Sequence, residues 1–238
     1  MSELSSPVKS TVNGAVYREA RIFYQKRDRA RYISHLDVTR CMQRALKRAN
    51  LSVWHTEGFN PHIYLTFALP LSLGYESLCE SMDIRLMAPD IDESAEEIRA
   101  RLNRALPDGI RVTEAAPPCC KPEEIASALY SVRISSERRS GESLLDAFGR
   151  FWDSERIEVE KKGKKGIRVI DIKPDCAVIS REAGPDGLLL RLKTAAGNQK
   201  NINPTLLTDE FLRREGIDEA YTRVVRQEMY RANGALFR

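Results

Sequence analysis

The stretch Tyr32-Ile33-Ser34-His35-Leu36-Asp37 opens the part of the chain that decides the fold. Ser34 and Asp37 have the spacing of a helix N-cap, in which the serine oxygen accepts a backbone N–H three residues further on. Apolar side chains then recur at helical spacing, at Val38, Met42, Ala45, Leu46 and Ala49. The pattern predicts an amphipathic helix that begins after Ser34 and packs its apolar stripe on a sheet.

The segments on both sides of this helix follow the patterns of strands and further helices. In the first half we expect strands at 17–25, 51–55, 63–69, 78–87 and 110–115, and a second helix at 92–106. In the second half we expect strands at 129–135, 157–160, 167–172, 177–180, 188–192 and 222–229, and helices at 143–152 and from Pro204 onward. The same order of elements occurs twice. The predicted fold is therefore α+β, with two tandem ferredoxin-like (βαββαβ) halves whose antiparallel sheets are backed by helices.

Shifts in composition predict where these halves begin and end. Residues 1–16 mix Ser, Pro, Lys and Gly with little periodicity, so we expect a flexible leader. The first half then covers residues 17–116. Pro117, Pro118 and Pro122 break the chain and predict a linker at 117–126, followed by the second half at 127–238.

The overall composition, with 42% apolar and 30% charged residues, is typical of a globular protein with a packed core. No run of about 18 apolar residues occurs, so no membrane helix is expected. The five cysteines lack regular spacing and indicate reduced thiols in the cytoplasm. None of them has the spacing of an iron–sulfur site, and we expect neither a cofactor nor a bound metal.

Positive charge is concentrated near the predicted first helix. Residues 18–48 contain ten Lys/Arg and three Asp/Glu, a net charge of +7, so the rest of the chain sums to −3 within the total of +4. The polar side of the helix carries Arg40, Arg44, Lys47 and Arg48. Such a surface favours an anionic partner, of which nucleic acid is the commonest. The alternative interpretation is a face that is simply solvated.

The loop Glu57-Gly58-Phe59-Asn60-Pro61-His62 is the second candidate surface. Phe59 and Asn60 can contact an RNA base, by stacking and by hydrogen bonding. The alternative is a plain turn with Phe59 anchored in the core. Glu57 and His62 are candidate catalytic residues.

His35, at the start of the predicted helix, is the third candidate catalytic residue, although a structural role is open to it as well. Tyr32, His35 and Lys47 together would provide the base, acid and charge stabiliser of a metal-free RNA cleavage. Whether His35, His55 and His62 converge is left open by the sequence. Glu80 falls on the apolar side of the strand 78–87, where a carboxylate needs a partner.

A set of these residues resembles the DUF2344 family, whose members are also called radical SAM-associated or radical SAM-linked proteins. The matching positions are Ser34, His35, Asp37, Glu57, Gly58, Phe59, Asn60, Pro61, His62, Gly74, Glu76, Ser77 and Glu80. The resemblance implies a companion of a radical SAM protein encoded nearby. Together with the basic helix, it predicts an accessory protein that binds RNA or presents a substrate and has no catalytic activity of its own. A protein–protein adaptor that binds only the radical SAM protein is the alternative.

The predicted tandem halves are also similar to CRISPR RNA-processing endonucleases. That likeness implies a metal-independent RNA endonuclease as a further alternative. Those enzymes carry a glycine-rich loop near the C-terminus. Here the corresponding stretch is only Ala232-Asn233-Gly234-Ala235, which puts the nuclease interpretation in doubt.

Overall fold

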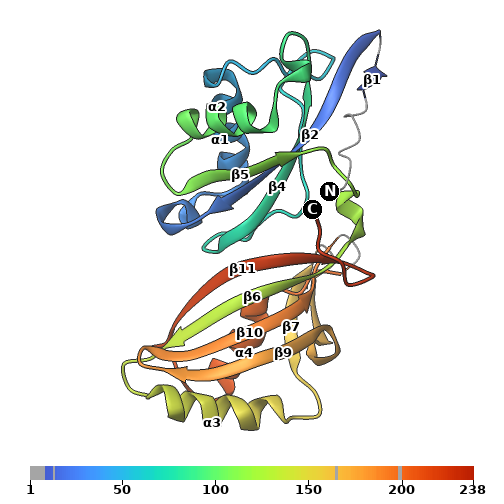
Figure 1. The fold of residues 1–238 in the computed structure, drawn as a ribbon. Helices are drawn as coiled ribbons and strands as arrows, with labels where there is room; N and C mark the ends of the chain where they lie inside the picture. The colour runs from blue at the N-terminus through green and yellow to red at the C-terminus, as the bar shows by residue number, and fades with distance from the viewer. Residues whose placement is uncertain (1–8, 13, 164–165, 198–199) are drawn as a thin grey trace, which may run out of the picture. The chain divides into compact units, whose positions relative to one another are not determined.

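The computed structural model describes residues 9–12, 14–163, 166–197 and 200–238. The chain divides into two compact units, one of residues 1–122 together with Arg238 and one of residues 123–237. Each unit combines a sheet with two α-helices, so the predicted α+β class is confirmed (Figure 1). No helix in the described ranges is long and apolar enough to cross a membrane.

The first unit orders its strands β5-β2-β4-β3, and each neighbouring pair is antiparallel. These strands are β2 (Ala15–Lys26), β3 (Leu65–Phe67), β4 (Glu76–Leu86) and β5 (Ile110–Ala116). A short strand, β1 (Lys9–Val12), pairs with the beginning of β2. The helices are α1 (His35–Arg48) and α2 (Ala95–Ala105), with short 3₁₀ helices η1 (Asp28–Tyr32) and η2 (Asp90–Asp92) before them.

Both helices cover the same face of this sheet. The buried core joins Met42 and Leu46 of α1 and Leu102 of α2 to Ile22 of β2 and Ile84 of β4. All five side chains are 0% exposed. The apolar stripe predicted for the first helix is therefore confirmed, and it packs on the sheet as expected.

The turn between β2 and α1 depends on one glycine of the α2–β5 connection. The Arg27 N–H donates to the Gly109 carbonyl at 2.8 Å. Gly109 has φ +83°, and a Cβ atom there would lie 2.8 Å from the Arg27 carbonyl oxygen and 2.9 Å from the Ala30 Cβ. Glycine is required at this position, because any side chain would displace η1 and with it the start of α1.

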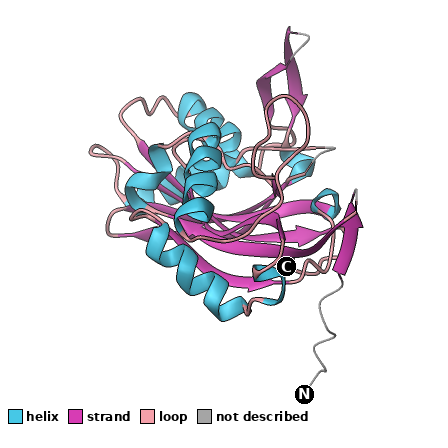
Figure 2. Cartoon of the chain, turned by 90° about the horizontal axis from the view of Figure 1, so that it is seen from above, coloured by secondary structure: helices cyan, strands magenta, loops and turns pink. Residues whose placement is uncertain are grey.

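The second unit orders its strands β11-β6-β10-β9, again with antiparallel neighbours. They are β6 (Ile125–Ser135), β9 (Cys176–Gly184), β10 (Gly187–Ala195) and β11 (Tyr221–Arg231). The helices are α3 (Gly141–Trp152) and α4 (Pro204–Arg214), and η3 (Pro122–Glu124) and η4 (Lys173–Asp175) are 3₁₀ turns. The hairpin of β7 (Glu158–Gly163) and β8 (Gly166–Asp171) forms a two-stranded sheet of its own, visible as a ribbon in Figure 2.

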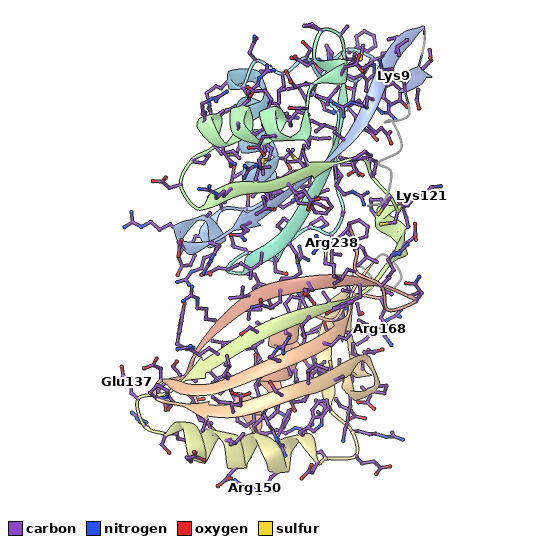
Figure 3. All side chains as sticks on the ribbon, viewed as in Figure 1. Lys9, Lys121, Glu137, Arg150, Arg168 and Arg238 are labelled. Carbon is purple, nitrogen blue, oxygen red and sulfur yellow. The ribbon has the colours of Figure 1, made fainter. Side chains whose placement is uncertain are left out.

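Several predicted boundaries are wrong. The range 51–55 is not a strand, because only the isolated bridges Val53–Leu86 and His55–Ile63 form there, and β3 is shorter than the predicted 63–69. Within the predicted flexible leader, Lys9–Val12 is a strand that begins at the Lys9 labelled in Figure 3. The Lys9 ammonium contacts the Asp92 carboxylate at 2.8 Å. The leader prediction for residues 1–8 and 13 lies outside the described residues. The end of the predicted linker belongs to β6, which begins at Ile125.

Candidate functional site

The first turn of α1 is fixed by the cap that the sequence predicts. Ser34 is the N-cap, and its Oγ accepts the Asp37 N–H at 3.2 Å. The same hydroxyl donates to the Asp37 carboxylate at 2.7 Å. The hydrogen bond from Ser34 is the largest of the effects that lower the pKa of Asp37. The carboxylate also lies in the first helical turn, where the helix dipole favours negative charge. This local network places His35, the next residue, at the first position of the helix.

His35 forms a cluster of titratable groups with Lys26 and Glu80, defined by the electrostatic effect of these two residues on its pKa. The His35 ring is half-buried and packs edge-on against Phe67 of β3, with ring centroids 4.9 Å apart. Burial lowers the pKa of His35, the nearby Glu80 carboxylate raises it and the Lys26 ammonium lowers it, and the net direction is down. The ring is therefore neutral near pH 7, and a neutral imidazole beside a carboxylate can accept or donate a proton.

The charged partners of His35 come from the sheet. Glu80 is 4% exposed and lies opposite Tyr24 in the β2–β4 register, on the face that the helices cover. Lys26 is 2% exposed, and its Nζ donates to the Ile33 carbonyl at 3.1 Å. This bond ties the end of β2 to the residue before the helix cap.

A second buried carboxylate of the motif pairs with η1. Glu76 is 0% exposed, and its Oε1 lies 3.3 Å from the Arg31 Nη1. Arg31 also donates to the Tyr32 hydroxyl at 2.6 Å, and its carbonyl accepts the Gly74 N–H at 2.9 Å. Gly74 has φ +85°, which glycine adopts without strain. The residues 74–76 are thereby held against η1, next to the start of α1.

The basic residues of α1 project from the helix surface. Arg40, Arg44, Lys47 and Arg48 are all exposed. Arg40 contacts Asp37 at 3.3 Å, and Arg48 donates to the Ala105 carbonyl at 2.7 Å. Among the described residues, Arg44 and Lys47 form no ion pair. The helix therefore keeps cationic groups available to an anionic ligand.

The loop 57–62 presents its aromatic residue to solvent. Phe59 is fully exposed, so the alternative of a turn with Phe59 anchored in the core is wrong. Gly58 has φ +114°, and the His62 Nδ1 lies 3.0 Å from the Thr56 hydroxyl and 3.1 Å from the Asn60 carbonyl. These contacts fix the histidine at the base of the loop.

The structure does not bring together the three groups of the predicted RNA cleavage. Lys47 is twelve residues after His35 in one helix, a rise of about 18 Å, so the two side chains do not share a reacting atom. His62 lies in its exposed loop and bonds to Thr56, whereas His35 packs on Phe67. Within the described part of the chain, no group of three or more His, Cys, Asp or Glu is arranged to hold a metal ion.

Sequence reasoning missed Lys26, Arg31 and Phe67 as members of this site. Lys26 continues the alternation of Ala20, Ile22 and Tyr24 on the helix-facing side of β2. The period of two predicts a buried position for it, and a buried ammonium needs a carboxylate partner. The contact between Arg31 and Glu76 spans 45 residues and leaves no local pattern in the sequence.

The motif positions agree with comparison to known proteins. The model of a family described as "Uncharacterized protein conserved in bacteria (DUF2344)" matches residues 19–204, which confirms the family predicted from the motifs. No curated protein matches the chain. Among solved structures, the chain is similar to one titled "Crystal Structure of an Unknown Protein from Galdieria sulphuraria". That similarity has 14% sequence identity and a TM-score of 0.26, and it covers 88% of this chain and 98% of the other.

Proposed function

We propose that this chain, which belongs to the DUF2344 family, binds RNA through the exposed basic face of α1 and acts as an accessory protein without catalysis of its own. The observation that carries the proposal is the row of four exposed cations, Arg40, Arg44, Lys47 and Arg48, on one helix. Their spacing of three or four residues aligns them along the helix surface.

The charge of this face is available for binding. The contact of Arg40 with Asp37 joins two side chains that are 67% and 55% exposed, and such surface pairs exchange readily for a phosphate. Arg44 lies in the second half of α1 and Lys47 in its last turn, and neither has a carboxylate partner among the described residues. Phosphates held by lysine and arginine supply most of the affinity for a nucleic acid without specifying its sequence.

The exposed loop adds a contact of another kind. An aromatic ring in solvent is a platform on which an unpaired base stacks, so Phe59 favours a single-stranded RNA over a duplex. Asn60, next to it, offers a donor and an acceptor to the edge of a base.

Both units are proposed to be ferredoxin-like. In each unit the strand that comes first in the βαββαβ order is central, next to the third strand, and the fourth and second strands lie outside. The orders β5-β2-β4-β3 and β11-β6-β10-β9 support this assignment, with the β7–β8 hairpin as an insertion in the second unit. This topology occurs with many functions and does not by itself select one.

The proposed partner is a radical SAM protein encoded nearby, to which the chain presents its bound RNA in the cytoplasm. This part of the proposal rests on the motif resemblance alone. Co-purification from the native host tests it. Recovery of the radical SAM protein together with RNA supports the accessory role, whereas recovery of the protein without RNA supports the adaptor.

The experiment for RNA binding compares two triple variants with the same loss of charge. In one, Arg40, Arg44 and Lys47 become Ala. In the control, the exposed Arg111, Arg133 and Arg150 become Ala, of which Arg150 is labelled on α3 in Figure 3. Affinity for cellular RNA is measured at several salt concentrations. The first variant is expected to flatten the salt slope by about 2 units, at about 0.7 per phosphate contact of a single strand. The control is expected to keep the slope.

A thermal unfolding measurement checks that the α1 variant is folded. Alanine is a good helix former and the three side chains are exposed, so the thermal midpoint is expected to change little. An equal loss of slope in both variants would show that only total charge matters. An unchanged slope in a folded α1 variant would leave the solvated-face interpretation.

The cluster of His35, Lys26 and Glu80 favours one second candidate, a metal-independent RNA endonuclease. Its half-buried imidazole with a carboxylate beside it is the pair that a proton transfer needs. Incubation of the purified chain with cellular RNA and a chelator separates the candidates. The accessory role predicts intact RNA. Reproducible cuts that disappear in His35→Ala, and persist in the matched His62→Ala variant, would favour the enzyme.

A further inference from the structure

Two neighbouring cysteines after β5 form a dithiol that the proposed function does not use. Cys119 and Cys120 have their Sγ atoms 3.8 Å apart. Cys119 is exposed and Cys120 is half-buried. Cys41 and Cys79 are half-buried, and Cys176 is buried. Burial raises the pKa of Cys41, and it raises the pKa of Cys176 to about 12.

The surroundings of the dithiol orient both sulfur atoms. The Cys119 and Cys120 thiols donate to the main-chain oxygen of Arg238 at 2.6 and 3.1 Å. The Arg21 Nη1 donates to the same oxygen at 3.3 Å and lies 3.6 Å from the Cys120 Sγ. The two thiols therefore share one acceptor, and a fixed cation lies beside one of them.

Arg21 is held rigidly enough for this contact to persist. Its side chain is 1% exposed, and it donates to both carboxylate oxygens of Asp83, at 2.7 and 2.8 Å. It also donates to the Cys120 carbonyl at 2.9 Å. The Arg21 guanidinium therefore holds a positive charge next to the Cys120 sulfur.

We propose that Cys119 and Cys120 are a modification site for hydroperoxides, where oxidation joins the two neighbouring sulfur atoms in a reversible disulfide. In the first step the exposed Cys119 thiol takes an oxygen atom from the peroxide. Its S–H and the O–O bond break, an S–O bond forms, and hydrogen peroxide leaves as water. In the second step the Cys120 sulfur attacks the Cys119 sulfur. The Cys119 S–O bond and the Cys120 S–H bond break, the S–S bond forms, and the hydroxide leaves with the Cys120 proton as a second water.

The covalent geometry makes the oxidised state a labile one. The Cα atoms of adjacent residues are about 3.8 Å apart across a trans peptide, which is less than the separation of about 4.4–6.8 Å in ordinary disulfides. A strained disulfide is reduced more readily than a relaxed one, so the modification is reversible by a small dithiol. Oxidation also removes both S–H donors from the main-chain oxygen of Arg238.

The experiment treats the full chain with hydrogen peroxide, then with an alkylating reagent, and examines the tryptic peptide of residues 112–133 by mass spectrometry. This peptide contains Cys119 and Cys120 and no other cysteine. The expected result is a loss of two hydrogen atoms with loss of alkylation at both sulfur atoms, and recovery of alkylation after dithiothreitol. Gel electrophoresis without reductant is expected to show a monomer.

Matched variants separate this site from general thiol oxidation. Cys119→Ser and Cys120→Ser are each expected to abolish the loss of two hydrogen atoms. Cys41→Ser is expected to retain it. Alkylation of both sulfur atoms after peroxide treatment, direct conversion to sulfinic or sulfonic acid, or a disulfide between two chains would each overturn the proposal.

Discussion

Arg101 fastens the end of α1 to α2, and its replacement by alanine tests how the first unit is held together. The guanidinium donates from Nε to the Ala49 carbonyl at 2.9 Å and from Nη2 to the Asn50 carbonyl. Its Nη1 donates to the Asp90 carboxylate at 2.8 Å. One side chain thus satisfies two carbonyls that follow the last turn of α1 and a carboxylate of η2.

The size of the expected stability loss in Arg101→Ala follows from the burial of the Arg101–Asp90 ion pair. The Arg101 and Asp90 side chains are 15% and 11% exposed. Removing one partner of a buried ion pair costs about 3–5 kcal/mol, because the other charge stays behind. A pocket of about 840 Å³ beside α1 and α2 is lined by Arg101 and Asp90, so water can hydrate the Asp90 carboxylate after Arg101 is removed. The expected loss in the free energy of unfolding is therefore at the low end, about 3 kcal/mol.

The same pair predicts how the loss depends on pH. Burial raises the pKa of Asp90, but hydrogen bonds from Arg101 and from the Ser52 N–H lower it, and the net direction is below its ordinary value. A carboxylate with a lowered folded pKa adds stability that is complete above the unfolded pKa and is lost as pH falls through the folded pKa. In Arg101→Ala this pKa rises, so the difference from the parent is expected to be largest near neutral pH and to shrink in acid.

The assay is urea unfolding followed by tryptophan fluorescence. The chain has two tryptophans, Trp54 in the first unit and Trp152 in the second. In a Trp152→Phe background the signal comes from Trp54, which packs on Tyr64 with ring centroids 5.4 Å apart. Arg99→Ala, on the same helix, is the matched control.

Among the residues that the structure describes, Arg99 pairs only with the exposed Glu96, so its removal is expected to leave the unfolding midpoint nearly unchanged. Two results would refute the reasoning. One is an Arg101→Ala variant that loses less than about 1 kcal/mol, the size of an exposed pair. The other is a loss that is the same at pH 3 and pH 7.

Three further outcomes follow from the start and the core of α1. Met42→Ala truncates a side chain that is 0% exposed and is expected to lower the free energy of unfolding by about 2–5 kcal/mol in a urea titration. Leu36→Ala, at a position that is 66% exposed, is the control and is expected to change the free energy of unfolding by less than about 0.5 kcal/mol. Ser34→Ala removes the helix cap and is expected to cost about 1 kcal/mol, measured by thermal unfolding, and no change would show that water replaces the cap. Glu80→Gln removes the carboxylate that raises the pKa of His35, so that pKa is expected to fall further in an NMR titration, and a rise would place Glu80 outside the cluster.

Local patterns predicted much of α1 and its cap, because capping and amphipathic spacing are properties of a few consecutive residues. The apolar stripe through Met42 and Leu46 and the cap at Ser34 were both predicted. The pairing of strands is not local, and there the sequence misled. The residues 51–55 alternate like a strand, yet they form only isolated bridges, from Val53 to Leu86 of β4 and from His55 to Ile63.

The candidate site was predictable only in part, because local patterns identify its residues but not their contacts across the fold. The motif residues His35 and Glu80 were identified, but their proximity depends on α1 lying over β4, which no spacing in the sequence encodes. Lys47 was predicted to act with His35 as a charge stabiliser, whereas the lysine whose charge affects the pKa of His35 is Lys26, from the preceding strand. Phe59 illustrates the opposite case. Its apolar character allowed either stacking on a base or burial in the core, and the structure leaves it fully exposed.

One edge of β2 is shared by two strands, and this has a consequence for the behaviour of the protein at high concentration. β4 pairs along one edge, and the other edge is covered by β1 from Ala15 to Arg18 and by β5 from Arg21 to Lys26. An uncovered edge offers its N–H and C=O groups to the strands of other molecules and promotes aggregation. The segment 9–12 thus shields the start of β2, where Val16 is 48% exposed, from pairing with a second copy of the chain. A chain shortened by its first fourteen residues would fold around the same core, but the uncovered edge at the start of β2 would promote its aggregation.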